Sequence, residues 1–236
     1  MKNLIIASTS TIHGSTYLSY IKDEIGALFQ GIERLTFIPY ARPGGISHDA
    51  YTEIAQKFFK HLDIKVKGLH EYEDPIAAIR MSQGIFTGGG NTFVLVNALH
   101  RKKLMQSLRE AIFYGIPYLG TSAGSNICGV TMQTTNDMPI IYPPSFKTLG
   151  VIPCNINPHY LDPIAGSKHM GETRETRIKE FHTQNNIPVL GLREGSWLRV
   201  NNKQTELQGS LTARVFEAGK EAYEIESGTV IDTLWS

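Results

Sequence analysis

GIFTGGGN at residues 84–91 and IPYLGTSAG at residues 116–124 decide the fold class of this chain. In both stretches a short apolar run leads into a glycine-containing turn and then into a segment able to form a helix. The segment between them, residues 92–114, has the periodicity of one long helix. Strands that need crossover helices build a parallel sheet with both faces covered. The two stretches therefore predict an α/β fold.

The same alternation of strand and helix runs through the first half of the chain. Apolar runs at residues 4–7, 35–40 and 64–69 precede helical patterns at 15–29, 49–62 and 74–82. Beyond residue 185 a strand is expected at 189–192, and segments near 197–200, 213–218 and 221–225 alternate with turn residues. We therefore expect a mostly parallel sheet covered by helices on both faces, with C-terminal antiparallel hairpins closing one edge.

Length and composition favour one intracellular domain that acts on a small molecule. The 236 residues contain no obvious linker, so we expect a single domain over 1–236. A net charge of +1 argues against a nucleic-acid partner. The first apolar run stops at Ser8, too early for a secretory signal, and no stretch approaches the ~20 apolar residues of a membrane span. Cys128 and Cys154 lack metal-ligand spacing and are expected to be buried. We expect a soluble, intracellular protein.

The second quoted stretch contains a candidate nucleophile. Residues 120–124, GTSAG, match the G-x-S-x-G pattern, in which small flanking residues let a serine hydroxyl stand exposed above a sheet. The expected strand before Ser122 and the helical segment after it are the context that this chemistry needs. The alternative is a glycine-rich turn with an ordinary helix-capping serine.

The first quoted stretch offers backbone donors for an oxyanion. Residues 88–91 follow a predicted strand, and glycine permits the close approach that an oxyanion hole requires. Parallel strands end on one rim, so this loop and the serine turn are expected to face one crevice. The alternative is an anion nest in a flavodoxin-like nucleotide-binding module. The loop lacks the lysine and hydroxyl residue that follow the glycines of a P-loop.

A serine nucleophile needs a base, and His159 in NINPHY at residues 155–160 is the best candidate among eight histidines. It follows the apolar run 151–153, as a residue at a strand end would. No pair of histidines has the spacing of a zinc peptidase, so no metal is expected. Two acids at loop positions, Asp137 and Glu194, are candidates to orient the histidine, and spacing alone does not choose between them.

Six strings, in order and spacing, resemble the peptidase E family of α-aspartyl dipeptidases. They are GGGNTF, TSAGSN, TTNDMPI, NPHY, GETRETRI and LREGSW. The resemblance implies a fold related to class I glutamine amidotransferases and a catalytic order of Ser122, His159 and Glu194, with Asp137 as a further acid needed for activity. It also implies dipeptide substrates with an N-terminal aspartate, no cofactor and cytoplasmic residence. A cyanophycinase-like peptidase remains an alternative.

A helix expected at residues 171–184 carries the residue that is the candidate to bind the substrate. Arg174 falls in one stripe with Ile178 and Phe181, and Arg177 lies at the edge of that stripe. An inward guanidinium needs an anionic partner. That partner is either the substrate β-carboxylate, held bidentately, or an internal carboxylate. Both interpretations predict that Arg174 is buried.

Together with the resemblance, which implies an exopeptidase, these residues predict a reaction through an acyl-enzyme. His159 deprotonates Ser122, and the N–H groups of Gly90 and Ala123 receive the oxyanion. An esterase would share the serine turn but normally has its acid before its histidine. We expect small peptide substrates and no membrane or nucleic-acid partner, and a homo-oligomer is compatible with the sequence.

Overall fold

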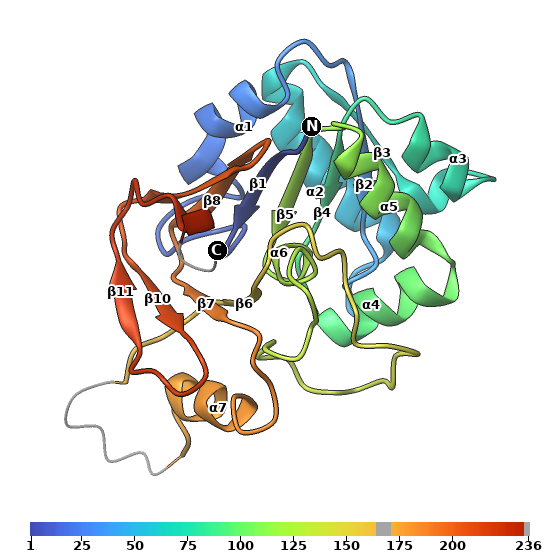
Figure 1. Ribbon diagram of the computed structural model, residues 1–236. Coiled ribbons are helices and arrows are strands. Elements are labelled where there is room, and N and C mark those ends of the chain that lie inside the picture. Colours follow the sequence, from blue (N-terminus) through green and yellow to red (C-terminus); the bar gives the residue numbers. More distant parts are fainter. Residues whose placement is uncertain (164–170, 234–236) are drawn as a thin grey trace.

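The computed structural model describes residues 1–163 and 171–233, which form two β-sheets and their covering helices (Figure 1). The larger sheet has the strand order β3-β2-β4-β5-β1-β8-β9. Its strands are β1 (Asn3–Ala7), β2 (Arg34–Ile38), β3 (Lys65–Gly68), β4 (Ile85–Thr87), β5 (Tyr118–Thr121), β8 (Ser196–Asn201) and β9 (Gln204–Gly209). The first five pair in parallel, and β8 and β9 add antiparallel strands at one edge. The expected mostly parallel sheet with an antiparallel edge is confirmed.

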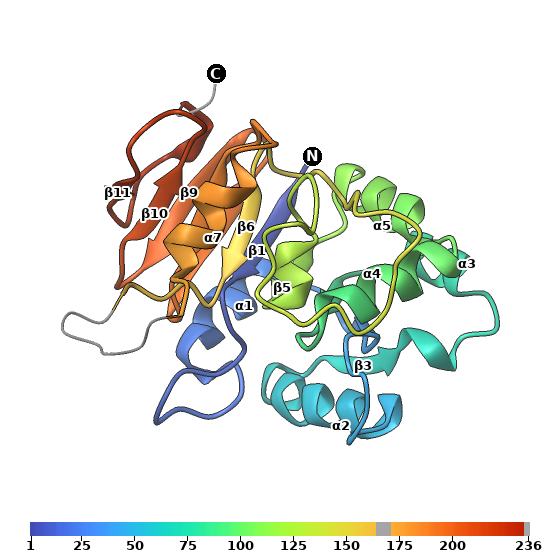
Figure 2. The same ribbon diagram turned by 90° about the horizontal axis from the view of Figure 1, so that it is seen from below.

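Helices cover both faces of this sheet (Figure 2). The helices of the larger sheet are α1 (Lys22–Leu28), α2 (His48–Phe59), α3 (Pro75–Arg80), α4 (Thr92–Arg101), α5 (Leu104–Phe113) and α6 (Ala123–Asn126). A further helix, α7 (Arg174–Phe181), lies on the smaller sheet. Short 3-10 turns occur at Ser19–Ile21, Lys60–Leu62, Leu69–Glu71 and Ile231–Thr233. None of these described helices is long and apolar enough to cross a membrane.

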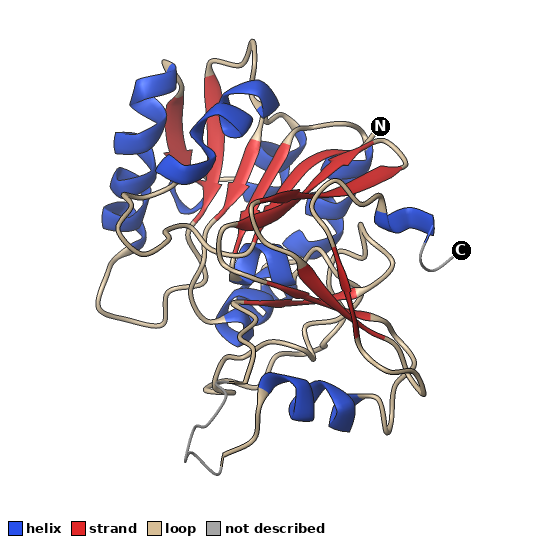
Figure 3. Cartoon of the chain, turned by 90° about the vertical axis from the view of Figure 1, so that its left-hand side faces the viewer, coloured by secondary structure: helices blue, strands red, loops and turns tan. Residues whose placement is uncertain are grey.

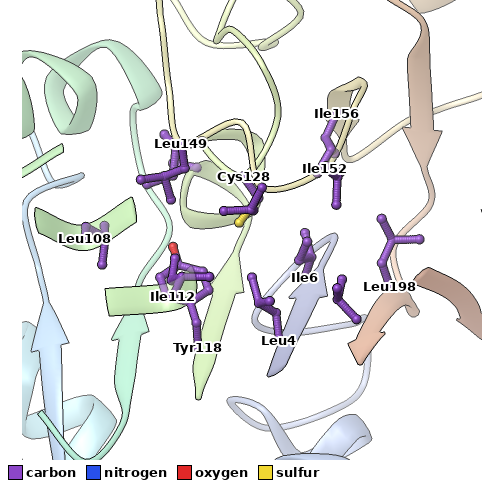
Figure 4. Packing of buried hydrophobic residues seen from close by; sticks show 14 of the residues in the cluster. Leu4, Ile6, Leu108, Ile112, Tyr118, Cys128, Leu149, Ile152, Ile156 and Leu198 are labelled. Carbon is purple, nitrogen blue, oxygen red and sulfur yellow. The ribbon is translucent and has the colours of Figure 1, made fainter. Parts of the chain in front are cut away.

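Strand β1 contributes side chains to the hydrophobic cores on both faces of the sheet. Its side chains alternate between two cores, because successive residues of a strand point to opposite faces. Leu4 and Ile6 pack with residues of α4 and α5, as Figure 4 shows for Leu108 and Ile112. Ile5 belongs to the other cluster, together with residues of α1 and α2. A strand that is buried on both faces reads as a continuous apolar run.

The smaller sheet has the order β11-β10-β7-β6 and shares a hydrophobic core with the larger one (Figure 3). Its strands are β6 (Asn155–Pro158), β7 (Val189–Leu192), β10 (Ala213–Phe216) and β11 (Tyr223–Ile225). Strands β6 and β7 are parallel, and the other pairs are antiparallel. Helix α7 packs on this sheet through Ile178. The C-terminal strands are thus divided between two sheets and do not all close one edge.

Three elements differ from the sequence expectation. The prediction of a single helix over 92–114 was wrong. The helix is interrupted between α4 and α5, where Lys103 adopts a left-handed conformation with φ of 57°. The strand before His159 is Asn155–Pro158 and not the apolar run 151–153. Strand β9 was missed because, in its polar sequence QTELQG, only Thr205 and Leu207 are fully buried.

Candidate functional site

Three predicted residues follow strands of the two sheets and form one chain of hydrogen bonds. Ser122 follows β5, His159 follows β6, and Glu194 lies two residues after β7. The Ser122 Oγ is 2.8 Å from Nε2 of His159, and the Nδ1 of His159 is 2.6 Å from Oε1 of Glu194. An ionised carboxylate only accepts hydrogen bonds, so Nδ1 carries the proton and Nε2 presents its lone pair to the serine.

The serine turn is strained, and its two glycines are needed for close backbone contacts. Ser122 has φ of 54° and ψ of −111°, an unfavourable conformation for a residue with a Cβ. A Cβ on Gly120 would strike the carbonyl oxygen of Gly124, and a Cβ on Gly124 would strike that of Thr87. The N–H of Ser122 donates to the Ala7 carbonyl at 3.2 Å. The turn therefore presents the Ser122 hydroxyl to His159, as the G-x-S-x-G pattern requires.

The glycine loop lies directly against the serine. A Cβ on Gly89 would come within 2.9 Å of the Ser122 Cβ, so a larger residue there would displace the nucleophile. Gly90 has φ of 144°, which favours glycine, and packs on the Ala41 carbonyl. Among the described residues, no backbone carbonyl accepts a hydrogen bond from the N–H of Gly90 or of Ala123. Both donors are available beside the nucleophile.

Asp137 lies at the start of α4 and not beside the histidine. Its Oδ2 accepts hydrogen bonds from the N–H of Thr92 at 2.7 Å and from the Thr135 hydroxyl at 3.0 Å. An acid at a helix N-terminus satisfies a backbone donor that has no partner within the helix. Of the two acids that spacing left open, Glu194 is the one that contacts His159.

Arg174 is only half-buried, so the expectation that it is buried was wrong. It is the first residue of α7 and is partly exposed to solvent. Burial and the neighbouring charge of Arg177 lower the pKa of Arg174, whereas the carboxylate of Asp137 raises it. Within the described part of the chain Arg174 forms no ion pair. Arg177 is exposed and pairs with Glu172 at 3.6 Å.

A cluster of charges behind Glu194 was not predicted. The guanidinium of Arg193 binds both oxygens of Asp162 at 2.8 and 2.9 Å and both oxygens of Glu224 at 2.8 and 3.0 Å. It also lies over the ring of Tyr160, the residue after His159. Burial would raise the pKa of Glu224, but its hydrogen bonds, chiefly from Arg193, lower it to about 2. Arg193 thus ties together the segments that carry the base and the acid.

The remaining candidates fall outside this site. Cys128 and Cys154 are buried and unpaired, as expected, and burial raises the pKa of both thiols. In residues 1–163 and 171–233 no group of three or more His, Cys, Asp or Glu side chains is arranged to hold a metal ion.

Comparisons with known proteins agree on one family. The model of peptidase family S51 matches residues 4–208. A peptidase E of Streptomyces coelicolor is 46% identical over 232 residues, which cover 98% of this chain and 94% of that protein. A "Probable alpha-aspartyl dipeptidase" of Drosophila melanogaster is 44% identical, over 92% of this chain and 90% of that protein. The crystal structure of a peptidase from an acI-B1 Actinobacterium has the same fold, with a TM-score of 0.73 at 16% identity, over 98% of this chain and 96% of that one.

Proposed function

This chain belongs to peptidase family S51, and we propose that it hydrolyses dipeptides whose first residue is aspartate. The observation that carries the proposal is the hydrogen-bonded series of Ser122, His159 and Glu194 beside the glycine loop. A serine, a histidine and a carboxylate in this arrangement are the parts of a serine acyl hydrolase. The names of the relatives add the substrate class.

The mechanism follows from the positions of the donors and acceptors. Nε2 of His159 takes the hydroxyl proton of Ser122 while Oγ attacks the aspartyl carbonyl carbon. The carbonyl oxygen becomes an oxyanion, which the N–H groups of Gly90 and Ala123 stabilise. His159 then gives its proton to the leaving amine as the C–N bond breaks. A water molecule, deprotonated by the same nitrogen, attacks the acyl carbon, the bond to Oγ breaks, Oγ takes the proton back from His159, and aspartate leaves. Glu194 stabilises the imidazolium in both steps.

In our proposal three charged side chains bind or support the aspartyl residue of the substrate. Arg174 is half-buried and without a carboxylate partner among the described residues, which suits a ligand for the β-carboxylate. Arg177 lies one turn further along α7, is more exposed, and has a secondary role in our proposal. The charge of Asp137 interacts with that of Arg174. Asp137 either binds the substrate α-amine or supports its own loop at the start of α4.

We further propose that residues 1–236 act as one peptidase domain, because Ser122 belongs to the larger sheet whereas His159 and Glu194 follow strands of the smaller one. A cytoplasmic location and assembly into a homo-oligomer are also proposals. Each calls for its own measurement, by cell fractionation and by sedimentation.

Release of free aspartate from Asp-Leu tests the function. We expect the wild-type protein to release it in the presence of EDTA and Ser122→Ala to lose at least ~10³-fold in kcat. Asn-Leu, a short-chain ester, cyanophycin and a nucleotide-binding measurement form the comparison set. Faster turnover of the ester or of cyanophycin would favour another acyl hydrolase, and nucleotide binding without hydrolysis would favour the binding module.

A further inference from the structure

The backbone at His159, directly after the Pro158–His159 peptide, has a left-handed conformation. His159 has φ of 54°, which is uncommon for a residue that carries a Cβ. Such a residue persists only where its surroundings fix it. Because the imidazole extends from this backbone, the direction of the base depends on whatever holds that peptide.

Two side chains hold it, one from each side. Nδ2 of Asn136 donates to the Pro158 carbonyl at 2.6 Å. On the other side the N–H of His159 donates to the Ser8 hydroxyl at 2.9 Å, and that hydroxyl donates in turn to the Leu192 carbonyl at 2.7 Å. Ser8 follows β1 of the larger sheet, and Leu192 ends the strand that leads to Glu194. The contact of Ser8 therefore connects both sheets at the base.

A buried amide orients Asn136. Asn157 is 3% exposed, and its Nδ2 donates to Oδ1 of Asn136 and to the Thr134 carbonyl, both at 2.8 Å. Its own Oδ1 is buried and has no hydrogen-bond partner among the described residues. An unpartnered buried acceptor lowers stability, so stability alone does not account for an amide at this position. By holding Oδ1 of Asn136, Asn157 directs the amide nitrogen of Asn136 to Pro158.

We propose that Asn136, Asn157 and Ser8 are positioning residues for the catalytic base. They fix the Pro158–His159 peptide so that Nε2 of His159 faces the hydroxyl of Ser122. This inference rests on the proposed role of His159. It differs from the proposed substrate site, because Asn136 acts on the base through the backbone and does not contact the reacting atoms.

Alanine substitutions at Asn136 and Asn157 test the proposal, with Asn155→Ala as the matched control. Asn155 lies on the same strand as Asn157 and is also buried, but its amide binds only Thr131. We expect Asn155→Ala and Asn157→Ala to lower the Tm by similar amounts. Only the substitutions at Asn136 and Asn157 should lower kcat, by about 10- to 100-fold with a much smaller change in KM, since a displaced base slows the chemical step.

The labelling rate of Ser122 by a fluorophosphonate separates the base from the substrate site. The reagent needs a serine activated by histidine but no aspartyl pocket. We expect Asn136→Ala to lower this rate by the same factor as kcat. Unchanged labelling with a raised KM would assign Asn136 to the support of Asp137 and overturn the proposal, as would equal kcat values for Asn155→Ala and Asn157→Ala.

The test still decides if one variant does not fold or if the proposed substrate is wrong. If Asn157→Ala does not fold, the half-buried Asn136 still carries the comparison, since its replacement leaves no deeply buried cavity. If wild-type protein reacts with the fluorophosphonate but does not cleave Asp-Leu, the proposed substrate is wrong. The labelling rates of the variants then still decide whether Asn136 and Asn157 position the base.

Discussion

Replacing Arg174 with alanine should weaken hydrolysis of Asp-Leu far more than hydrolysis of Asn-Leu. The guanidinium is half-buried and therefore partly desolvated before substrate binds. This burial and the charge of Arg177 lower its pKa. None of the described carboxylates pairs with it. A substrate β-carboxylate would supply the missing anion, whereas the side-chain amide of Asn-Leu carries no charge.

The structure sets the size of the expected effect. Truncating one partner of a desolvated charge pair costs about 2 to 5 kcal/mol. Because Arg174 keeps part of its surface in solvent, the lower part of that range applies, about 2 to 3 kcal/mol. At 1.36 kcal/mol for each factor of ten, kcat/KM for Asp-Leu should fall roughly 30- to 160-fold. Arg174→Lys should restore only part of this loss, because an ammonium cannot form the bidentate fork.

The measurement is kcat/KM for both dipeptides, with thermal unfolding of each variant. Arg177→Ala is the matched control, since Arg177 belongs to the same helix but is exposed and paired with Glu172. It should change kcat/KM for Asp-Leu only a few-fold. Equal losses of Arg174→Ala on Asp-Leu and Asn-Leu would refute the reasoning, and so would a larger effect of the Arg177 substitution.

Three further outcomes follow from the site. Ser122→Gly should abolish turnover of Asp-Leu yet raise the free energy of unfolding by about 1 kcal/mol, since glycine tolerates a φ of 54°. Denaturant unfolding measures this change, and a lower stability of the variant would show that the Ser122 backbone is not strained. In steady-state assays Glu194→Gln should lower kcat more than it raises KM, because the acid stabilises the imidazolium of the transition state. A rise in KM without a fall in kcat would argue against this role. The pKa of Glu224 is depressed to about 2, so its stabilising bonds to Arg193 are present above its usual pKa and are lost as pH falls toward 2. Glu224→Gln should therefore lower the Tm at pH 7 and flatten the fall in Tm between about pH 4.5 and 2, and an unchanged acid profile would contradict it.

Most of the fold could be predicted because apolar periodicity is a local property. Strands buried on both faces, such as Asn3–Ala7, read as apolar runs between helical segments. The break at Lys103 could not be predicted, because lysine is a good helix former and the left-handed φ there depends on how α4 and α5 pack. Strand β9 was missed because its sequence is polar and contains only one apolar residue, Leu207.

The acid partner of His159 shows how one misplaced strand limits a site prediction. With a strand at 151–153, the position of His159 relative to the C-terminal strands was undefined, and Asp137 and Glu194 remained equivalent. The strand is Asn155–Pro158, and it pairs in parallel with β7, so that Pro158 lies opposite Leu192. Parallel strands end at one edge, and residues just beyond this pair, His159 and Glu194, must therefore meet. Asp137 precedes the first strand of that pair and belongs to the helix N-terminus that it caps.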